Sequence, residues 1–426
     1  MKLKMEFRTM DVDVLLQAQA KYNPRKNLKP GDEEYEQIKR SIHEFGFVQP
    51  PVFNIRTQTL VGGHQRLKCL KDLGGQNVEV VIVDLPIEQE KLLNIALNKV
   101  QGAWDFGKLA ELLDELSKMP ELDETLTGFT DKEIGQVFDR YLDVGGDDGF
   151  DADAQAAAIE QPITQPGDII ELGQHRIMCA DAAEPENLGR LFQGECADLY
   201  WSDWPYRVSY DSTRRPGSSG KKLWEKITGD DFSEEEYDAW MQKVIEATKP
   251  RLKDGASIYI WSGHREFWTM QYLLKQAGFK PSCVITWAKP SISPSYASYQ
   301  WQTEFCLFGW KLGAAHSWYG KAESSLWEVN RDPVSKLQHA TQKPLELVHR
   351  ALKNSSQRGD LVLDSCLGSG SCLIGAENLG RRCFGFEIDA RYCDVIARRY
   401  IGHVGPNNVA PELKAKYFKG GEHGRA

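Results

Sequence analysis

The feature that most constrains the fold is a strand–turn–helix–strand pattern between residues 361 and 387. The apolar run Leu361-Val-Leu-Asp364 ends in an acid, a glycine turn at 368–370 follows, and a helical stretch leads to a second apolar run that ends in Glu387. Glycines let a ligand approach the backbone, and the helix N-terminus offers free N–H groups. An acid at the end of the second strand suits ribose hydroxyl groups. The pattern predicts a site for a nucleoside-containing cofactor, although a plain packing turn could have the same residues.

Strands and helices alternate on both sides of this unit. We predict further strands at 197–201, 257–261, 283–287 and 304–308, and helices at 233–248, 266–276, 344–353, 371–379 and 390–400. Such alternation predicts an α/β domain with a largely parallel sheet. In the N-terminal part we predict strands at 51–55, 59–61 and 78–83, and helices at 33–45, 65–73, 88–97 and 106–119.

A second motif, Asp203-Trp204-Pro205-Tyr206, follows the apolar run at 197–201. An exocyclic amine of a base is a poor nucleophile because the ring withdraws its lone pair. Two acceptors on its N–H groups would restore that lone pair, and we predict that the Asp203 carboxylate and the Trp204 carbonyl are those acceptors. Pro205 would stiffen the turn, and Tyr206 would stack on a base extruded from the duplex. The alternative is an aromatic-rich loop capped by an acid.

Residues 142–166 divide the chain. Between 143 and 160 there are six acids and no Lys or Arg, and no hydrophobic period is sustained. This composition predicts a flexible acidic linker between an N-terminal domain (1–141) and a C-terminal domain (167–402), with a flexible tail at 403–426. The linker also accounts for most of the net charge of −9, so a local basic groove elsewhere is compatible with the composition.

The composition excludes several classes of protein. With 41% hydrophobic and 27% charged residues, the chain is typical of folded globular proteins rather than disordered ones. No apolar run approaches the ~18 residues of a membrane span, and the N-terminus lacks an apolar signal segment. The nine cysteines include no CxxC pair, so we expect reduced thiols, no metal site and a cytoplasmic protein without membrane contact.

The two motifs together resemble those of S-adenosylmethionine-dependent DNA amino-methyltransferases, in the motif order of the β class. The segment 166–181 is similar to the family's lead-in, and 339–344 is similar to the motif before the cofactor strand. The resemblance implies a Rossmann-like domain, S-adenosylmethionine as the cofactor and double-stranded DNA as the substrate. It places Asp181 near the cofactor adenine and Lys343 at its methionine end. The other implied cofactor-binding residues are Asp364, Ser365, Cys366, Gly368, Ser369, Gly370 and Glu387.

The chain departs from the family pattern in both motifs. Trp204 stands where proline is usual, with a bulk expected to narrow the pocket, and Ser365 and Cys366 replace proline and phenylalanine. Three explanations stay open: a methylase that tolerates the changes, a catalytically silent DNA-binding or regulatory protein, or a site for an altered cofactor. In the last case Ser365 and Cys366 would make room that Trp204 refills. Asp203 favours adenine N6 over cytosine N4, because the family's cytosine members more often have serine there.

Three N-terminal segments, at 22–25, 42–51 and 61–67, resemble a ParB-type N-terminal domain, a smaller α+β domain. In that family the Gly-x-x-Arg stretch contacts nucleotide phosphates or DNA, and ParB-like domains joined to such methylases are typical of phage and prophage genes. The residues implied here are Arg25, Gly63, His64 and Arg66. A purely structural Arg66 is the alternative, and whether the domain binds a nucleotide and whether the chain forms a homodimer stay open.

A basic stretch at 214–222 is suited to DNA phosphates. Its cations are Arg214, Arg215, Lys221 and Lys222. The alternative is a solvated loop.

Overall fold

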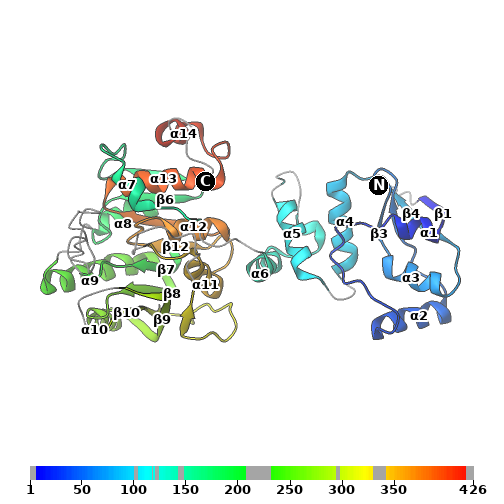
Figure 1. Cartoon of the computed structure of the whole chain (residues 1–426), viewed down its shortest axis with the longest axis horizontal. Helices are drawn as coiled ribbons and strands as arrows, with labels where there is room; N and C mark the ends of the chain where they lie inside the picture. The colour runs from blue at the N-terminus through cyan, green and yellow to red at the C-terminus, as the bar shows by residue number, and fades with distance from the viewer. Residues whose placement is uncertain are drawn as a thin grey trace. The chain divides into compact units, whose positions relative to one another are not determined.

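The computed structural model describes residues 6–99, 104–117, 119, 124–142, 148–207, 232–293, 298–329 and 342–418. The chain divides into two compact units, residues 1–143 and 144–426, which are described separately (Figure 1). In the part of the chain that the structure describes, no helix combines the length and the apolar character that a membrane span needs.

The first unit is built on a four-stranded sheet in the order β1-β4-β2-β3. Its strands are β1 (Glu6–Asp11), β2 (Val52–Asn54), β3 (Thr59–Gly62) and β4 (Asn77–Val83). Its first helices are α1 (Val12–Gln17), α2 (Glu33–Phe45), α3 (His64–Asp72) and α4 (Ile87–Lys99). Alternate residues of β4 are buried, and Val80 packs with Leu15 of α1 and Leu67 of α3 in one apolar core. These elements confirm the expected α+β domain.

A second apolar core in this unit joins α4 to the helices that follow it. These are α5 (Phe106–Ser117), a short 3-10 helix (Glu124–Thr127) and α6 (Asp131–Tyr141). Leu92 of α4, Leu113 of α5 and Phe138 of α6 are all buried there. Thr130 and Glu133 form a capping box that begins α6, a helix that our sequence analysis did not predict.

The second unit contains a nine-stranded sheet in the order β11-β9-β10-β8-β7-β12-β13-β6-β5. The strands are β5 (Ile169–Leu172), β6 (His175–Cys179), β7 (Ala197–Asp203), β8 (Leu252–Ser262), β9 (Phe279–Ser293), β10 (Trp301–Lys311), β11 (Leu326–Glu328), β12 (Leu361–Asp364) and β13 (Arg382–Glu387). The five neighbours from β8 to β6 are all parallel, whereas β10 and β5 pair antiparallel. The predicted largely parallel sheet is therefore confirmed at its centre.

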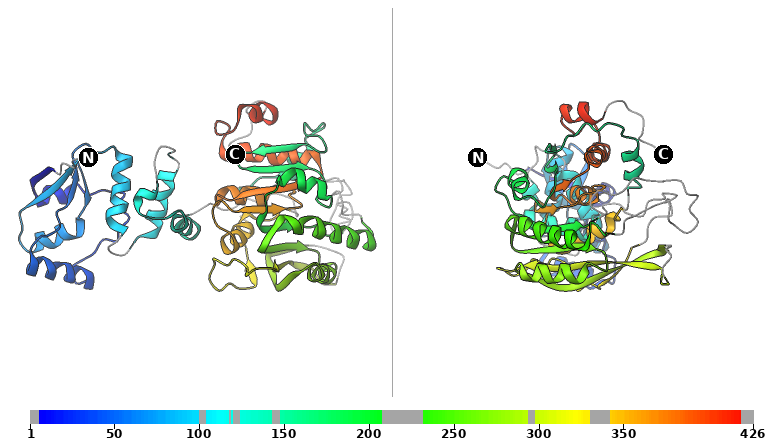
Figure 2. Two further views of the ribbon diagram at one scale, coloured as in Figure 1. Left: turned by 180° about the vertical axis from the view of Figure 1, so that it is seen from behind. Right: turned by 90° about the vertical axis from the view of Figure 1, so that its left-hand side faces the viewer.

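Helices cover both faces of this sheet (Figure 2). They are α8 (Pro185–Phe192), α9 (Glu234–Thr248), α10 (Phe267–Gln276), α11 (Leu345–Ser355), α12 (Ser371–Asn378) and α13 (Ala390–Val404), with a 3-10 turn at Lys249–Arg251. Successive residues of a strand point to opposite faces. Val362 of β12 accordingly packs in the core with α11, α12 and α13, whereas Leu361 and Leu363 pack in the core with α8, α9 and α10. This is the expected Rossmann-like architecture.

Two short helices lie within the segments for which the sequence predicts a flexible linker and tail. Helix α7 (Ala152–Ala157) packs on Val395 of α13, and α14 (Pro411–Tyr417) buries Tyr417. The backbone N–H of Thr164 donates to the buried Asp394 carboxylate at 3.0 Å. Some acids of this segment have partners, such as Asp148 with Arg399 at 2.8 Å.

Candidate active site

Four acids lie at one edge of the large sheet. Asp203 ends β7, Asp364 ends β12, Glu387 ends β13, and Asp181 follows β6 by two residues. These four strands are parallel neighbours in the order β7-β12-β13-β6, so their carboxyl ends meet at the same edge. Open α/β sheets bind their ligands at this edge. The sheet order therefore brings the two motifs that the sequence identified into one site.

The Asp203-to-Tyr206 turn is anchored on both sides. The backbone N–H of Trp204 donates to the carbonyl of Trp261 in β8 at 3.0 Å. The hydroxyl of Tyr237 in α9 donates to the carbonyl of Pro205 at 2.5 Å. These two bonds fix the backbone on either side of the Trp204 carbonyl, the predicted amine acceptor.

Lys343 contacts the predicted catalytic acid directly. Its ammonium nitrogen donates to both carboxylate oxygens of Asp203, at 2.8 and 2.7 Å, and to the Tyr206 hydroxyl at 3.0 Å. The resemblance had placed Lys343 at the methionine end of the cofactor, and the structure places it on Asp203. Burial raises the pKa of Asp203, although the charge of Lys343 opposes the rise. Burial alone would lower the pKa of Lys343, but Asp203 and Glu304 outweigh it and the pKa is raised.

Glu304 is a site residue that the sequence analysis missed. It lies on β10, forms an ion pair with Lys343 at 2.9 Å and accepts a hydrogen bond from Tyr206 at 3.2 Å. It also forms an ion pair with Lys289 of β9. Burial would raise the pKa of Glu304, yet the two lysines lower it to about 2. One feature of the sequence could have identified Glu304, because it is an acid in a predicted strand, 304–308, that is otherwise apolar.

The glycine turn has the conformation that its sequence predicts. Gly368 and Gly370 have φ values of +52° and +81°, which favour glycine, and Gly370 directly precedes α12. A side chain at Gly368 would meet open space, so a ligand could lie against this backbone. Ser369 holds the turn from the other side, because its carbonyl accepts from Arg399 at 2.8 Å.

Glu387 closes the turn from the neighbouring strand. Its carboxylate accepts from the backbone N–H groups of Gly368 at 2.8 Å and Asp389 at 2.9 Å. Burial raises the pKa of Glu387 to about 7, and burial likewise raises the pKa of Asp364 to about 7. Asp181 accepts from the backbone of Ala183 at 2.8 Å. A buried carboxylate beside an open glycine turn fits the hydroxyl groups of a ribose, so these residues fit a nucleoside-containing cofactor.

The two departures from the family pattern meet in one buried cluster. The indole N–H of Trp204 donates to the hydroxyls of Ser365 and Tyr200, both at 3.2 Å. Ser202 connects Ser365, at 2.8 Å, to the Asp364 carboxylate, at 3.0 Å. Trp204 is only 1% exposed and packs in the apolar core.

Cys366 lies beside this cluster. It is partly buried and packs against the same apolar core, and its backbone N–H donates to the Asp364 carboxylate at 3.0 Å. The predicted cofactor-site residues at 364–366 are therefore held by bonds to β7 and within their own turn.

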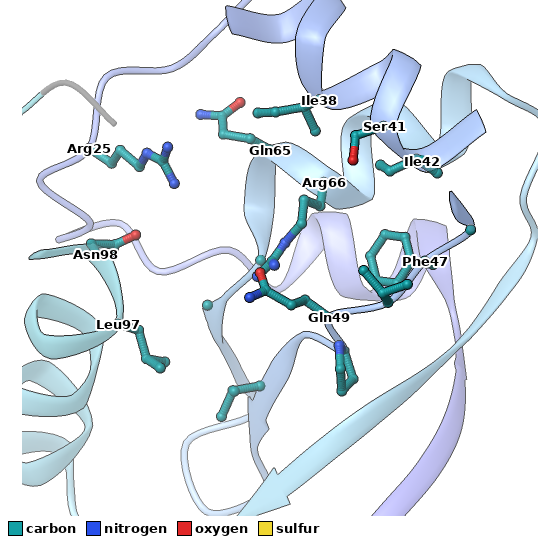
Figure 3. Close-up of a pocket in the computed structure, with 16 residues that line it drawn as sticks. Arg25, Ile38, Ser41, Ile42, Phe47, Gln49, Gln65, Arg66, Leu97 and Asn98 are labelled. Atoms are coloured by element: carbon teal, nitrogen blue, oxygen red, sulfur yellow. The ribbon is translucent and has the colours of Figure 1, made fainter. Parts of the chain in front are cut away.

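The first unit contains a separate cavity of about 420 Å³ (Figure 3). Arg25, Gly63 and Arg66 line it, and both guanidinium groups point toward the same space. Burial lowers the pKa of Arg66, and the charge of Arg25 adds to this effect. Within the described residues, neither arginine forms an ion pair with a carboxylate, which argues against a purely structural Arg66.

His64, the fourth residue implied at this site, does not line the cavity. It is buried, its Nδ1 lies 3.2 Å from the Asn23 amide, and its Nε2 has no partner within the described residues. Burial lowers the pKa of His64 to about 4.

Two groups of predicted residues lie outside the described residues. One is the basic stretch with Arg214, Arg215, Lys221 and Lys222. The other is the beginning of the segment at 339–344.

Comparison with known proteins assigns families to three regions of the chain. Residues 197–398 match the DNA methylase family of the N6/N4 class. Residues 4–99 match the ParB N-terminal domain, and residues 107–166 match the ParB-methyltransferase HTH domain. The last match covers α5 from its second residue, α6 and the whole of the predicted linker.

Curated relatives are type II methyltransferases. M2.MboI of Moraxella bovis is 26% identical over 53% of this chain and 86% of its own length. M2.DpnII of Streptococcus pneumoniae is 29% identical over 48% of this chain and 82% of its own length. Among solved structures, M1.HpyAVI in complex with SAM is 23% identical, with a TM-score of 0.39 over 52% of this chain and 98% of that one. The chain therefore contains a DNA methylase domain of the N6/N4 class at residues 197–398, and a ParB N-terminal domain and a ParB-methyltransferase HTH domain precede it.

Proposed function

We propose that this protein transfers a methyl group from S-adenosylmethionine to N6 of an adenine that is flipped out of double-stranded DNA. The observation that carries the proposal is the position of Asp203 at the same sheet edge as the glycine turn and Glu387. Methyl transfer needs the amine acceptor and the methyl donor within reach of each other, and adjacent parallel strands supply that proximity.

The target amine would be activated by two acceptors. The Asp203 carboxylate accepts one N–H, and the carbonyl of Trp204 accepts the other, so the nitrogen lone pair is released from the ring. The anchored turn holds both acceptors, because Trp204 and Pro205 are each bonded to a neighbouring element. Tyr206 offers its ring to the flipped base.

Bound S-adenosylmethionine would supply an electrophilic methyl group. Gly368 and Gly370 would let the cofactor approach the backbone, Glu387 would accept hydrogen bonds from its ribose, and Asp181 would lie near its adenine. Ser365, Cys366 and Ser369 shape the turn, and Asp364 lies beneath it. After transfer, the amine loses a proton to Asp203 or to water.

Nucleoside mass spectrometry tests the proposal directly. DNA from cells that express the protein should contain new N6-methyladenine, and DNA from cells with Asp203→Ala should not. The control Asp254→Ala removes an exposed acid of the same unit that pairs with Lys311 and should leave the product unchanged. New N4-methylcytosine would overturn the choice of base. No new product from a soluble wild-type protein would favour a silent DNA-binding protein.

An altered cofactor is the second candidate for this site, and it predicts a DNA mass shift other than ~14 Da, the mass of a methylene. In this candidate Trp204 refills the room beside Ser365, and the indole is buried and bonded there.

A second function is favoured by the cavity of the first unit. We propose that Arg25 and Arg66 bind the phosphates of a nucleotide there, since two unpaired guanidinium groups facing one cavity suit a polyanion. Equilibrium binding of nucleoside triphosphates should weaken strongly in Arg66→Ala. Competition by duplex DNA instead of nucleotide would assign the arginines to DNA.

The basic stretch at 214–222 is proposed to bind DNA phosphates. Replacing Lys221 and Lys222 by Ala should then weaken DNA binding for all sequences and reduce its salt dependence. An unchanged salt dependence would mean that the stretch is a solvated loop.

A further inference from the structure

We propose that Glu304 is a positioning residue for methyl transfer, because its carboxylate holds both Lys343 and Tyr206 against Asp203. This inference rests on the proposed function, in which Asp203 accepts a hydrogen bond from the target amine. Neither motif of the sequence contains Glu304, and it reaches the site from the antiparallel part of the sheet.

The contacts form a chain of alternating charges. Lys289 pairs with Glu304, Glu304 pairs with Lys343 at 2.9 Å, and Lys343 pairs with Asp203 at 2.7 Å. The side chains of Glu304 and Lys343 are only 12% and 7% exposed. Buried charges are tolerated where each has a partner of opposite charge, and each of these four side chains has such a partner among the others. Without Glu304, Lys289 would lose this partner and Lys343 would keep only its pair with Asp203.

Glu304 also determines how strongly Lys343 holds Asp203. The Lys343 ammonium competes with the target amine for the lone pairs of Asp203, because it donates to both carboxylate oxygens. Glu304 pairs with the same ammonium at 2.9 Å, so Lys343 shares its charge between the two carboxylates. Glu304 fixes the Tyr206 hydroxyl as well, so one carboxylate orients the amine acceptor and the stacking ring.

The charges around Asp203 determine in which direction its pKa should shift when Glu304 or Lys289 is replaced. The groups that face it are Lys343 before α11, Glu304 and Cys306 on β10, Tyr206 on its own turn, and Asp364 on β12. The negative charge of Glu304 raises the pKa of Asp203, and the positive charge of Lys343 lowers it. Removing the charge of Glu304 should therefore lower the pKa of Asp203, and removing Lys289 should raise it by leaving Glu304 less compensated.

The test compares two variants of the full chain across pH. In Glu304→Gln, kcat should fall by about tenfold or more while the KM for S-adenosylmethionine changes little, and the acid limb of the kcat profile should move to lower pH. In Lys289→Met, the acid limb should move to higher pH. If Glu304 and Lys289 served only to stabilise the fold, the acid limbs of the two variants would not move in opposite directions.

Glu323→Gln is the matched control, because Glu323 pairs with Arg350 in the same unit. Its profile should match that of the wild type. An active wild type with an unchanged kcat profile in Glu304→Gln would overturn the inference, as would a variant that only melts at a lower temperature. Absence of methyl transfer by the wild type would instead reject the proposed function.

Discussion

The indole nitrogen of Trp204 lies 3.2 Å from the hydroxyl oxygen of Ser365, so a hydrogen bond joins the turn after β7 to the first residue after β12. Both residues replace prolines of the family pattern, and proline has no side-chain donor or acceptor. The two substitutions therefore form one matched pair. The bond also ties the position of the Trp204 carbonyl to the strand that carries Asp364.

A double-mutant cycle should detect this pair. Trp204→Phe and Ser365→Ala each remove the hydrogen bond, and their effects on the free energy of unfolding should be non-additive by about 1 kcal/mol. Ser365→Ala combined with Trp240→Phe is the control, because Trp240 touches the Trp204 ring edge-on at 5.6 Å without joining the hydrogen bonds. Additive effects in the first cycle would contradict the pairing.

Lys343→Met should abolish activity and destabilise the protein. Two carboxylates, Asp203 and Glu304, would then remain buried near each other without the shared cation. Removing one partner of a buried ion pair costs about 3–5 kcal/mol, so denaturant unfolding should show a loss of this order. Unimpaired methylation by Lys343→Met would refute the role that we assign to this lysine.

The sequence predicted Asp203, Asp364 and Glu387 from a local pattern, an apolar run that stops at an acid, whereas Asp181 was predicted from the resemblance of residues 166–181 to the lead-in of the family. It could not predict the contact of Glu304 with Lys343. Glu304 lies on β10, which joins the sheet by antiparallel pairing with β8 and β9, whereas Lys343 lies before α11, and no local period encodes their contact. The contact between Glu304 and Lys343 could therefore not be predicted, because it depends on the order of the strands in the folded sheet.

Among the elements that the sequence analysis missed, β1 and α7 were missed for different physical reasons. Strand β1 exposes most of its side chains, so backbone pairing with β4 rather than an apolar pattern stabilises it. Helix α7 is rich in alanine and acids, which resembles a linker in composition. Its small side chains, Ala152 and Ala156, nevertheless allow close packing on Val395. Composition alone does not distinguish such a helix from a flexible segment.

Cofactor affinity should depend on pH through Glu387. Burial raises the pKa of this acid to about 7, so it loses its charge when the pH falls through that value. The carboxylate accepts ribose hydroxyls better than the neutral acid does, and the Kd for S-adenosylmethionine should therefore rise between about pH 8 and pH 6. Calorimetry should show a smaller dependence in Glu387→Gln, with Asp364 supplying what remains.

Glu387 and Asp364 should make the protein less stable as the pH rises from acidic to neutral values. A carboxyl group whose pKa is raised in the folded state stabilises that state below its unfolded pKa of about 4, and this contribution is lost as the pH rises through the folded value. The free energy of unfolding should therefore decline between about pH 4 and pH 7 through Glu387 and Asp364. Replacing both by their amides should flatten that part of the curve, and an unchanged slope would contradict the assigned pKa values.

Thr164→Val should show that the segment before residue 167 is part of the methylase unit. The Thr164 hydroxyl and backbone N–H both donate to Asp394, a fully buried carboxylate on α13. Valine keeps the shape but removes the hydroxyl donor, so the carboxylate loses a bond that water cannot replace. Leaving a buried group unsatisfied costs about 1–3 kcal/mol, and thermal unfolding of the second unit should occur at a lower temperature. Thr286→Val, at a half-buried position in β9, is the matched control and should have little effect. Equal melting temperatures for Thr164→Val and the wild type would mean that residues 148–166 contribute little to the unit, as the composition of this segment had predicted.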